Sequence, residues 1–249
     1  MSKIGNLLVV FFLVLGSGCA SVEKGNIDNS DPYEKGNRSV FNLNDTLDQH
    51  LMQPVARGYV KVTPKFFRTG VSNFFSNLAY LNVILNSFLQ GKFGQGFSDT
   101  GRFLFNSTLG IGGLFDVATP MGLEEHEEDL GQTFAEWGID QGAYLNIPFL
   151  GPNTARNTPD YATSALTNPL TYIGSLVILP IALLDLINTR AELLEATDIV
   201  EDAALDKYSF TREAYLQQRK NLIYDGNPPA DSNDDFLNED SNGGSLSIE

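Results

Sequence analysis

Residues 64–89 read PKFFRTGVSNFFSNLAYLNVILNSFL, and their apolar residues come in pairs every four positions. The pairs Phe66-Phe67, Gly70-Val71 and Phe74-Phe75 are separated by polar pairs. This spacing follows the 3.6-residue period of an amphipathic helix. Pro64 suits the first turn of such a helix, because the amide hydrogen that proline lacks would have no partner there. Residues 64–78 are therefore predicted to form a helix with one apolar and one polar side.

The helical period recurs further along the chain. Two further helical segments are predicted, Leu81 to Phe93 and Gly101 to Leu109. A helix near the end of the chain, terminated by Gly226 and Pro228, is predicted from a stripe of Leu205, Tyr208, Tyr215 and Leu222. Alternation typical of a strand is weak and confined to Ala143 to Phe149, where Pro148 interrupts it. The predicted fold class is all-α.

Leu176 to Ile187, with the sequence LVILPIALLDLI, is the most apolar interior stretch. With Tyr172 and Ile173 it still falls short of the roughly 20 residues that span a bilayer, and it contains Pro180 and Asp185. Two interpretations are open. The stretch is either a buried core helix or a short, kinked helix that lies within one membrane leaflet without crossing the bilayer.

The polar sides of the predicted helices carry neutral amides rather than charges. Water-facing helices usually carry charged residues. Neutral amides suit a wet but weakly charged interior, such as a channel that passes both a headgroup and acyl chains. The simpler interpretation is that asparagines cap helices and fill turns. The residues in question are Asn37, Asn42, Asn44, Asn73, Asn77, Asn82, Asn86 and Asn106.

The N-terminus reads as a secretory signal. Lys3 precedes nine apolar residues, Leu7 to Leu15, which are too few to span a bilayer, and Gly16-Ser17-Gly18-Cys19 follows. This ending resembles a bacterial lipobox, although Gly16 stands where lipoboxes usually have Leu. Residues 1–18 are therefore the predicted signal peptide, and Cys19 is the predicted lipid-attachment site. The alternative is an ordinary signal peptide with an incidental cysteine.

Polar tethers are predicted at both ends of the mature chain. Residues 19–30 form an acylated tether, and Ala20-Ser21 after the cysteine lacks the Asp that signals inner-membrane retention, so the outer membrane is the expected destination. Residues 225–249 contain seven acidic residues, no Lys or Arg, and Pro228-Pro229. Such a stretch buries too little apolar surface to offset its ordering entropy and is predicted to be disordered. Residues 31–224 remain as one helical domain.

Composition and motifs argue against an enzyme and against a nucleic-acid binder. The chain has 31 Asp and Glu against 16 Lys and Arg, whereas phosphate binding needs a basic face. One cysteine and two histidines cannot build a four-ligand zinc site, so no metal and no cofactor are expected. Gly110-Ile111-Gly112-Gly113 lacks the later Lys-Ser/Thr of a phosphate loop and favours a hinge or a tight helix crossing. His126, within the acidic run 124–129, favours a solvated loop over a cation site.

Many short blocks of the chain resemble the MlaA (VacJ) family of outer-membrane lipoproteins, and they occur in the family's order over about residues 31–222. The blocks are Asp31-Pro32-Tyr33-Glu34, Asn37-Arg38, Phe41, Asn44, Gln53-Pro54-Val55-Ala56, Gly70-Val71-Ser72-Asn73-Phe74, Leu89-Gln90-Gly91, Gly101-Arg102-Phe103-Leu104, Asn106, Gly110, Gly112-Gly113, Phe115-Asp116, Glu128-Asp129, Gly131-Gln132-Thr133, Trp137-Gly138, Gly142, Tyr144, Pro148, Gly151-Pro152, Thr189-Arg190-Ala191 and Arg212-Glu213-Ala214-Tyr215. Three positions depart from the pattern: Leu81 replaces a frequent Pro, Ala135 a common Gly, and Asn157 a usual Asp.

The resemblance implies a fold and a function. It implies a ring-like bundle of amphipathic helices in the inner leaflet of the outer membrane of a Gram-negative bacterium, around a central channel and on the periplasmic face. Such lipoproteins associate with a trimeric porin, remove mislocalised phospholipid from the outer leaflet and hand it to a soluble periplasmic lipid carrier. Two other hypotheses stay open: a structural lipoprotein that scaffolds porins without moving lipid, and a hydrolase that uses the acidic run.

Two segments are candidates for a pore lip or gate. The first is polar and aromatic and includes Asn37, Asn42, Leu43 and Asn44. The second has the backbone freedom to let a lip or hinge move, through Gly110, Gly112 and Gly113.

Overall fold

The computed structural model describes residues 31–229, so the predicted signal peptide, Cys19 with its tether, and the tail beyond residue 229 lie outside the described residues. In chain order the elements are α2 (Glu34–Leu47), the π-helical turn η1 (Asp48–Met52), α3 (Gln53–Val62), α4 (Lys65–Leu89), α5 (Phe93–Thr108), the 3₁₀ turn η2 (Thr119–Met121), α6 (Leu130–Glu136), β1 (Tyr144–Ile147), β2 (Gly151–Thr154), α7 (Asp160–Thr167), the 3₁₀ turn η3 (Pro169–Tyr172), α8 (Ser175–Glu192), α9 (Leu194–Ala203) and α10 (Lys207–Ile223).

α4 is one continuous helix of 25 residues, not the two segments that the periodicity indicated. Leu81 retains the amide hydrogen that a proline would lack, so the helix runs through this position without a break. α5 begins at Phe93, eight residues before the predicted start at Gly101. Its early glycines allow close packing on α4, since a Cβ at Gly96 would lie 3.0 Å from the Phe88 ring.

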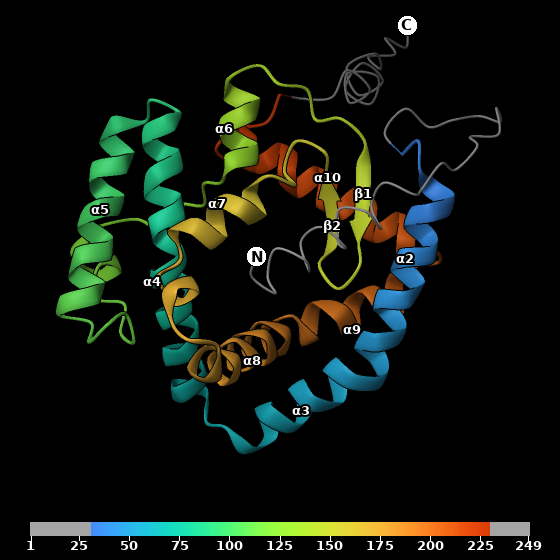
Figure 1. Cartoon of the computed structure of the whole chain (residues 1–249). Coiled ribbons are helices and arrows are strands. Elements are labelled where there is room, and N and C mark those ends of the chain that lie inside the picture. The colour runs from blue at the N-terminus through green and yellow to red at the C-terminus, as the bar shows by residue number, and fades with distance from the viewer. Residues whose placement is uncertain (1–30, 230–249) are drawn as a thin grey trace, which may run out of the picture.

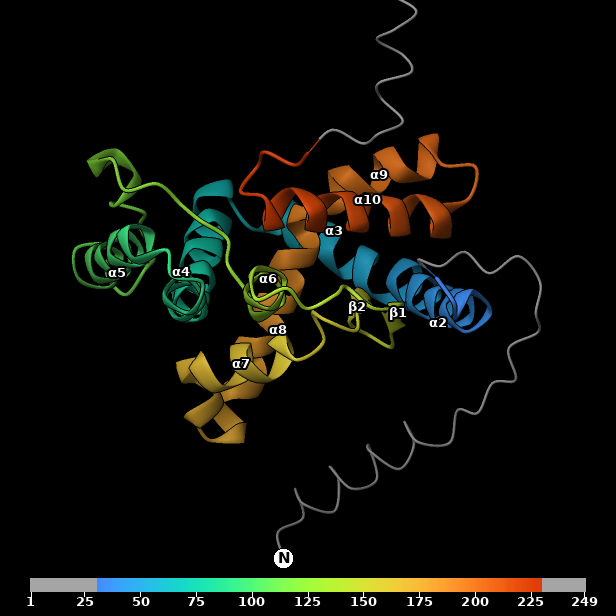
Figure 2. The ribbon, with the colours of Figure 1, turned by 90° about the horizontal axis from the view of Figure 1, so that it is seen from above.

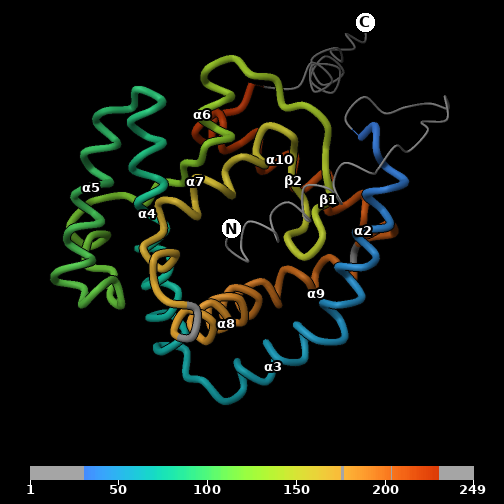
Figure 3. Tube along the Cα trace, in the orientation of Figure 1, coloured from blue at the N-terminus to red at the C-terminus, as the bar shows by residue number. Residues whose placement is uncertain are grey.

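Figure 1 shows the elements following one another around a closed circuit. α4 stands on one side with α5 outside it, α3 runs along the bottom, and α2 stands on the opposite side. The hairpin packs on α2, and α10, α6 and α7 lead back to α4. α8 packs against α3 and α4 and leads into α9, as the Cα trace of Figure 3 shows.

β1 and β2 form an antiparallel hairpin that the all-α prediction omitted. Tyr144 pairs with Thr154 at one end and Ile147 with Gly151 at the other, so Pro148 falls in the turn, where it interrupts no ladder hydrogen bond. Phe149 in this turn has a φ of 66°, a left-handed conformation. The rest of the described chain is helical or irregular, and the predominantly helical fold class is confirmed.

The described residues bury more polar than apolar side chains. Only eight apolar residues are buried, and three of them (Ala56, Ala191 and Leu194) form the small cluster where α3 meets α8 and α9. Nineteen polar or charged residues are buried, while many large apolar side chains face outward. Ordinary globular domains show the reverse preference. The interior of this molecule is therefore held mainly by hydrogen bonds and ion pairs.

α8 illustrates this inversion. Val177, Leu179 and Leu183 are 56%, 62% and 48% exposed, so the interpretation of this stretch as a buried core helix is wrong. Among the side chains of α8 that the structure describes, the buried ones are Asn188 and Ala191, near the C-terminal end, where the helix meets α3 and α4. Within the described part of the chain, no helix combines the length and apolar character needed to cross a membrane.

Candidate functional site, an apolar exterior around a polar interior

The asparagines of α4 tie neighbouring helices together from buried positions. Asn86 is fully buried and accepts a hydrogen bond from Thr133 Oγ1 of α6 at 2.8 Å. Asn82 donates to Asp160 Oδ1 of α7 at 3.0 Å, and Asn77 donates to Ser107 Oγ of α5 at 2.9 Å. These side chains lie within α4 and join it to α5, α6 and α7. They replace the apolar contacts that usually join helices.

Arg102 of α5 and Asp116 of the loop that follows form a second polar centre. Arg102 Nη2 lies 2.9 Å from Asp116 Oδ2, and Nη1 donates to Leu123 O at 2.8 Å. Burial raises the pKa of the Asp116 carboxyl, but hydrogen bonds from Thr119, Arg102 and Asn106 outweigh it and lower the pKa to about 2. The carboxylate is therefore firmly ionised, and it holds the loop after the glycine run in place.

The acidic run is a loop with Glu124, Glu125 and Glu127 exposed, as the sequence favoured, but its last two carboxylates are withdrawn from water and paired. Glu128 is buried and lies 2.8 Å from Lys92 Nζ, and Asp129 receives two hydrogen bonds from Arg219 at 2.5 and 2.9 Å. Burial raises the pKa of Asp129, but the Arg219 guanidinium more than compensates and keeps it below its usual range. His126 Nδ1 lies 2.8 Å from Oδ1 of the buried Asp99 carboxyl, within hydrogen-bond distance. Among the described residues, no group of three or more His, Cys, Asp or Glu is arranged to hold a metal ion.

In the candidate segment on α2, Asn37 and Asn44 hold neighbouring parts of the chain together. Asn37 is buried, donates to Asp31 Oδ1 at 2.7 Å and to Tyr144 O at 2.9 Å, and accepts from Asn146 N at 2.9 Å. Asn44 binds the hairpin turn, because its Oδ1 accepts a hydrogen bond from Phe149 N at 2.8 Å. The Asn42 and Leu43 side chains, by contrast, are exposed on α2.

The glycine run makes a tight turn against α4. Gly110 is buried, and a Cβ there would lie 2.2 Å from Phe115 O. Gly113 has a φ of 92°, and its Cβ would meet Asn77 at 2.6 Å. Gly112 also has a positive φ, of 70°, but a Cβ there would enter open space.

The structure does not bring the two candidate segments together. α2 and the end of α5 lie at opposite sides of the circuit in both Figure 1 and Figure 2. They cannot form a single lip by direct contact. Asn42, Leu43 and Gly112 are the members whose side chains or Cβ positions face open space.

Large apolar side chains are exposed all around the circuit. Exposed apolar side chains occur on nearly every element. Six that are between 67% and 80% exposed are Val62, Phe66, Phe97, Phe149, Leu166 and Tyr172. Exposed apolar surface of this extent marks contact with a membrane or a protein. This surface, together with the polar interior that supports it, is the candidate functional site.

Figure 2 shows that the two faces of the circuit differ. α9 and α10 lie on one face and α7 on the other, with α8 between them. α9 exposes four carboxylates, Glu195, Asp198, Glu201 and Asp202, whereas the α7–η3 segment exposes Leu166 and Tyr172. The α9 helix therefore presents carboxylates on one face, and the α7–η3 segment presents large apolar side chains on the other.

The sequence analysis missed the charged members of the interior. Asp99, Arg102 and Arg219 stand within helical segments and are buried with ion-pair partners. Their signal in the sequence is a charge within an otherwise apolar or amide-rich segment. The partners of these residues are 14 to 90 positions away in the chain, so the sequence alone did not pair them.

Comparison with known proteins gives a consistent result. A family model described as "MlaA lipoprotein" matches residues 29–222. The proteins named intermembrane phospholipid transport system lipoprotein MlaA from Shigella flexneri and Escherichia coli (strain K12) are 35% and 34% identical over 213 residues, which cover 84% of this chain and 84% of each relative. A solved structure, reported under "Structural basis for maintenance of bacterial outer membrane lipid asymmetry", is similar with a TM-score of 0.69 and 32% identity, covering 80% of this chain and 100% of that one.

Proposed function

Because the chain belongs to the MlaA lipoprotein family, we propose that it takes mislocalised phospholipid from the outer leaflet of the bacterial outer membrane and hands it to a soluble periplasmic carrier. The matched relatives are named for intermembrane phospholipid transport. The observation that carries the proposal for this chain is the apolar exterior around a polar interior.

An apolar exterior of this kind needs a lipid environment. Burying one large apolar side chain contributes about 1.5–3 kcal/mol relative to leaving it in water. Side chains such as Phe66 and Tyr172, 80% and 71% exposed, forgo most of that stabilisation in water and regain it among acyl chains. The polar interior keeps its hydrogen bonds whether water or acyl chains surround the protein. The fold therefore does not depend on the hydrophobic effect alone.

The proposed position is a single leaflet. Acyl chains on Cys19 anchor the protein, and several chains on one residue hold it durably. The α7–η3 face of Figure 2, with its exposed Leu166 and Tyr172, points into the bilayer, and the face that carries the α9 carboxylates points to the periplasm, where the carrier docks. The passage for lipid runs through the middle of the circuit of Figure 1, and a trimeric porin contacts the apolar outer surface.

The pore lip or gate stays part of this proposal. Asn42 and Leu43 lie on the exposed side of α2, and Gly112 faces open space after α5. Gly110, Gly113, Asn37 and Asn44 hold these segments in position through close packing or hydrogen bonds. A deletion of Asn42-Leu43 turns the rest of α2 by about 200°, which moves Asn44 off the hairpin turn, and is expected to leave the passage ungated.

The test measures outer-leaflet phospholipid in a strain that depends on this chain. Acyl modification of outer-leaflet lipid and detergent sensitivity are scored and normalised to the amount of folded lipoprotein. Leu179→Asp places a charge on the apolar surface of α8 and is expected to reduce lipid removal, because a carboxylate among acyl chains costs about 2.5–3.5 kcal/mol. Leu179→Met, which keeps the same exposed position of α8 apolar, is the matched control and is expected to leave clearance unchanged.

Two results would favour the competing hypotheses. If Leu179→Asp and a complete gene deletion both leave outer-leaflet lipid unchanged while porin assembly fails, the chain is a structural scaffold and not a transporter. If lipid removal stops when metal ions are chelated, or in His126→Ala at normal protein levels, the hydrolase hypothesis is favoured. Phospholipid that co-purifies with the protein in detergent would support transport over scaffolding.

A further inference from the structure

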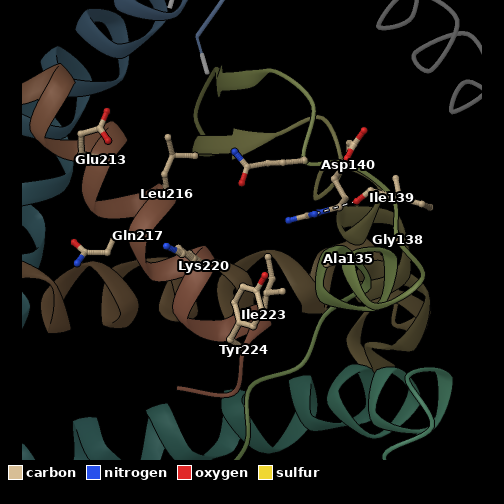
Figure 4. A pocket seen from close by; sticks show the side chains of 12 residues that line it. Ala135, Gly138, Ile139, Asp140, Glu213, Leu216, Gln217, Lys220, Ile223 and Tyr224 are labelled. Carbon is tan, nitrogen blue, oxygen red and sulfur yellow. Dashed lines mark hydrogen bonds between the residues drawn. The ribbon is translucent and has the colours of Figure 1, made fainter. Parts of the chain in front are cut away.

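A cavity of about 690 Å³ lies outside the glycine and asparagine segments. It opens between the end of α6, the loop that leads to β1, and one side of α10 (Figure 4). Its volume falls within the roughly 300–1,000 Å³ range of small-molecule sites. The proposed gate and the family resemblance assign nothing to this cavity.

Arg156 lines the cavity with most of its donors unused. Its Nη1 donates to Ile139 O at 3.0 Å, while its Nε is buried without a hydrogen-bond partner among the described residues. A guanidinium has five N–H donors, and buried donors normally have partners. Burial and the neighbouring Arg219 lower the pKa of Arg156, which shows that nearby carboxylates do not fully compensate its charge. The cavity wall therefore offers hydrogen-bond donors to an anion.

A carboxylate stands beside this cation. Arg156 N donates to Gln141 O at 3.1 Å, and Arg156 Nη1 reaches Ile139 O, so these two bonds hold Asp140 next to the guanidinium. Asp140 is exposed and lines the cavity. The other carboxylate in the wall, Glu213, is 2.8 Å from Arg212 and is already paired.

The remaining walls are amphipathic. Lys220 on α10 adds a second cation, and Leu216, Ile223 and Tyr224 form an apolar side next to it (Figure 4). A ligand that fits has an anion for Arg156 and Lys220, a cation for Asp140, and an apolar end. A phosphodiester with a pendant primary ammonium and attached acyl chains has this combination.

We propose that this cavity binds the headgroup of a zwitterionic phospholipid of the phosphatidylethanolamine class. The phosphate lies against Arg156 and Lys220, the ammonium against Asp140, and the first part of the acyl chains against Leu216 and Ile223. This inference rests on the proposed function and extends it by naming the headgroup and the place where it is held. Free phosphate shares part of this chemistry and is distinguished by the experiment.

The chain carries its own reporter for this test. Trp137 is the only tryptophan in the sequence, and it directly precedes Gly138 in the cavity wall. Full-length acylated protein in an uncharged detergent is titrated with short-chain phosphatidylethanolamine, short-chain phosphatidylglycerol and inorganic phosphate while Trp137 fluorescence is recorded. Wild-type protein is expected to bind phosphatidylethanolamine more tightly than phosphatidylglycerol, and inorganic phosphate weakly.

Variants separate the two halves of the headgroup. Arg156→Gln is expected to weaken binding of both lipids about tenfold or more, because it removes charge-assisted hydrogen bonds to the phosphate. Asp140→Asn is expected to weaken phosphatidylethanolamine alone and to abolish the preference. Arg57→Gln, at an exposed ion pair with Asp198 on another part of the molecule, is the matched control and is expected to change neither titration.

Three outcomes would overturn the inference. These are unchanged titrations for Asp140→Asn, equal binding of all three probes, and saturation by inorganic phosphate alone. Because Asp140 is exposed, that variant tests the site even if Arg156→Gln folds poorly, which circular dichroism would show. Outer-leaflet lipid is measured on the same variants: normal clearance without cavity binding rejects the cavity, whereas cavity binding in a chain that never clears lipid rejects the proposed function.

Discussion

Single buried amides connect parts of this chain that are far apart in sequence. Asn37 joins the first described residue, Asp31, to the hairpin at Tyr144 and Asn146. Asp31 also accepts hydrogen bonds from Tyr208 and Arg212 of α10. The pKa of the Tyr208 hydroxyl is raised, mainly because it is buried and also because it donates a hydrogen bond to Asp31. The point where the predicted tether meets the folded body is therefore fixed by polar contacts.

We expect Asn37→Leu to destabilise the protein by about 2–4 kcal/mol, because it leaves buried donors and acceptors of Asp31, Tyr144 and Asn146 without a partner. Asn42→Ala, on the exposed side of the same helix, is the control and should change stability by less than about 0.5 kcal/mol. Thermal denaturation in detergent measures both. Equal stability of the two variants would show that the Asn37 contacts contribute little.

Asp116 gives a prediction for acidic pH. Its pKa is lowered from 3.8 to about 2 in the folded state, so the unfolded chain binds this proton more tightly. The stabilisation is full above pH 4 and is lost as the pH falls toward 2. Asp116→Asn should therefore cost about 1–2 kcal/mol at pH 7 and show a smaller loss than wild type between pH 4 and pH 2. Melting curves at pH 7, 4 and 2 test this, and parallel losses in both proteins would contradict it.

At the scale of elements, the α4–α5 pair depends on close backbone approach. Gly96 allows the Phe88 ring to approach within 3.0 Å of where a Cβ would stand, and Gly113 lies against Asn77 in the turn after α5. The two helices are thus joined at both ends by glycine contacts. The same turn carries one of the proposed gate segments.

Gly112 and Gly113 form a matched pair for testing that turn. Both have positive φ, so alanine at either position is strained by about 1 kcal/mol, but only Gly113→Ala also clashes, at 2.6 Å from Asn77. We expect Gly113→Ala to lower the melting temperature more than Gly112→Ala. Gly112→Leu should keep most folded protein and reduce lipid removal. If its lipid removal falls only in proportion to folded protein, the turn does not gate the passage.

At the scale of the whole molecule, membrane attachment depends on a residue outside the described range. Within residues 31–229 no helix is long and apolar enough to cross a bilayer. Cys19→Ala should therefore leave the protein unacylated and largely absent from the outer-membrane fraction, with lipid removal lost. Cys19→Ser is expected to behave in the same way. Fractionation with immunodetection measures this, and a mutant that still sediments with outer membrane and clears lipid would refute the lipobox interpretation.

Much of the fold was predictable because helical periodicity is a local property. The spacing of Phe66-Phe67, Gly70-Val71 and Phe74-Phe75 was enough to predict α4, and the apolar stretch at Leu176 to Ile187 was enough to predict α8. The sequence also showed that the apolar stretch at Leu176 to Ile187 is too short to span a bilayer. The family resemblance, carried by short blocks in register, is confirmed by the family model and by the relatives.

Only the tertiary structure decided what each face of these helices contacts. Periodicity divides a helix into an apolar and a polar side, but it does not say whether protein, lipid or water lies against either. Here the amides of Asn82 and Asn86 are buried and Leu179 is exposed, the reverse of a water-soluble domain. The same limit applies to Arg156 and Asp140, which are 16 positions apart and meet only because hydrogen bonds to Ile139 and Gln141 close the loop before the hairpin. Local sequence determines the elements, whereas long-range contacts determine which polar groups are withdrawn from water and where a cavity forms.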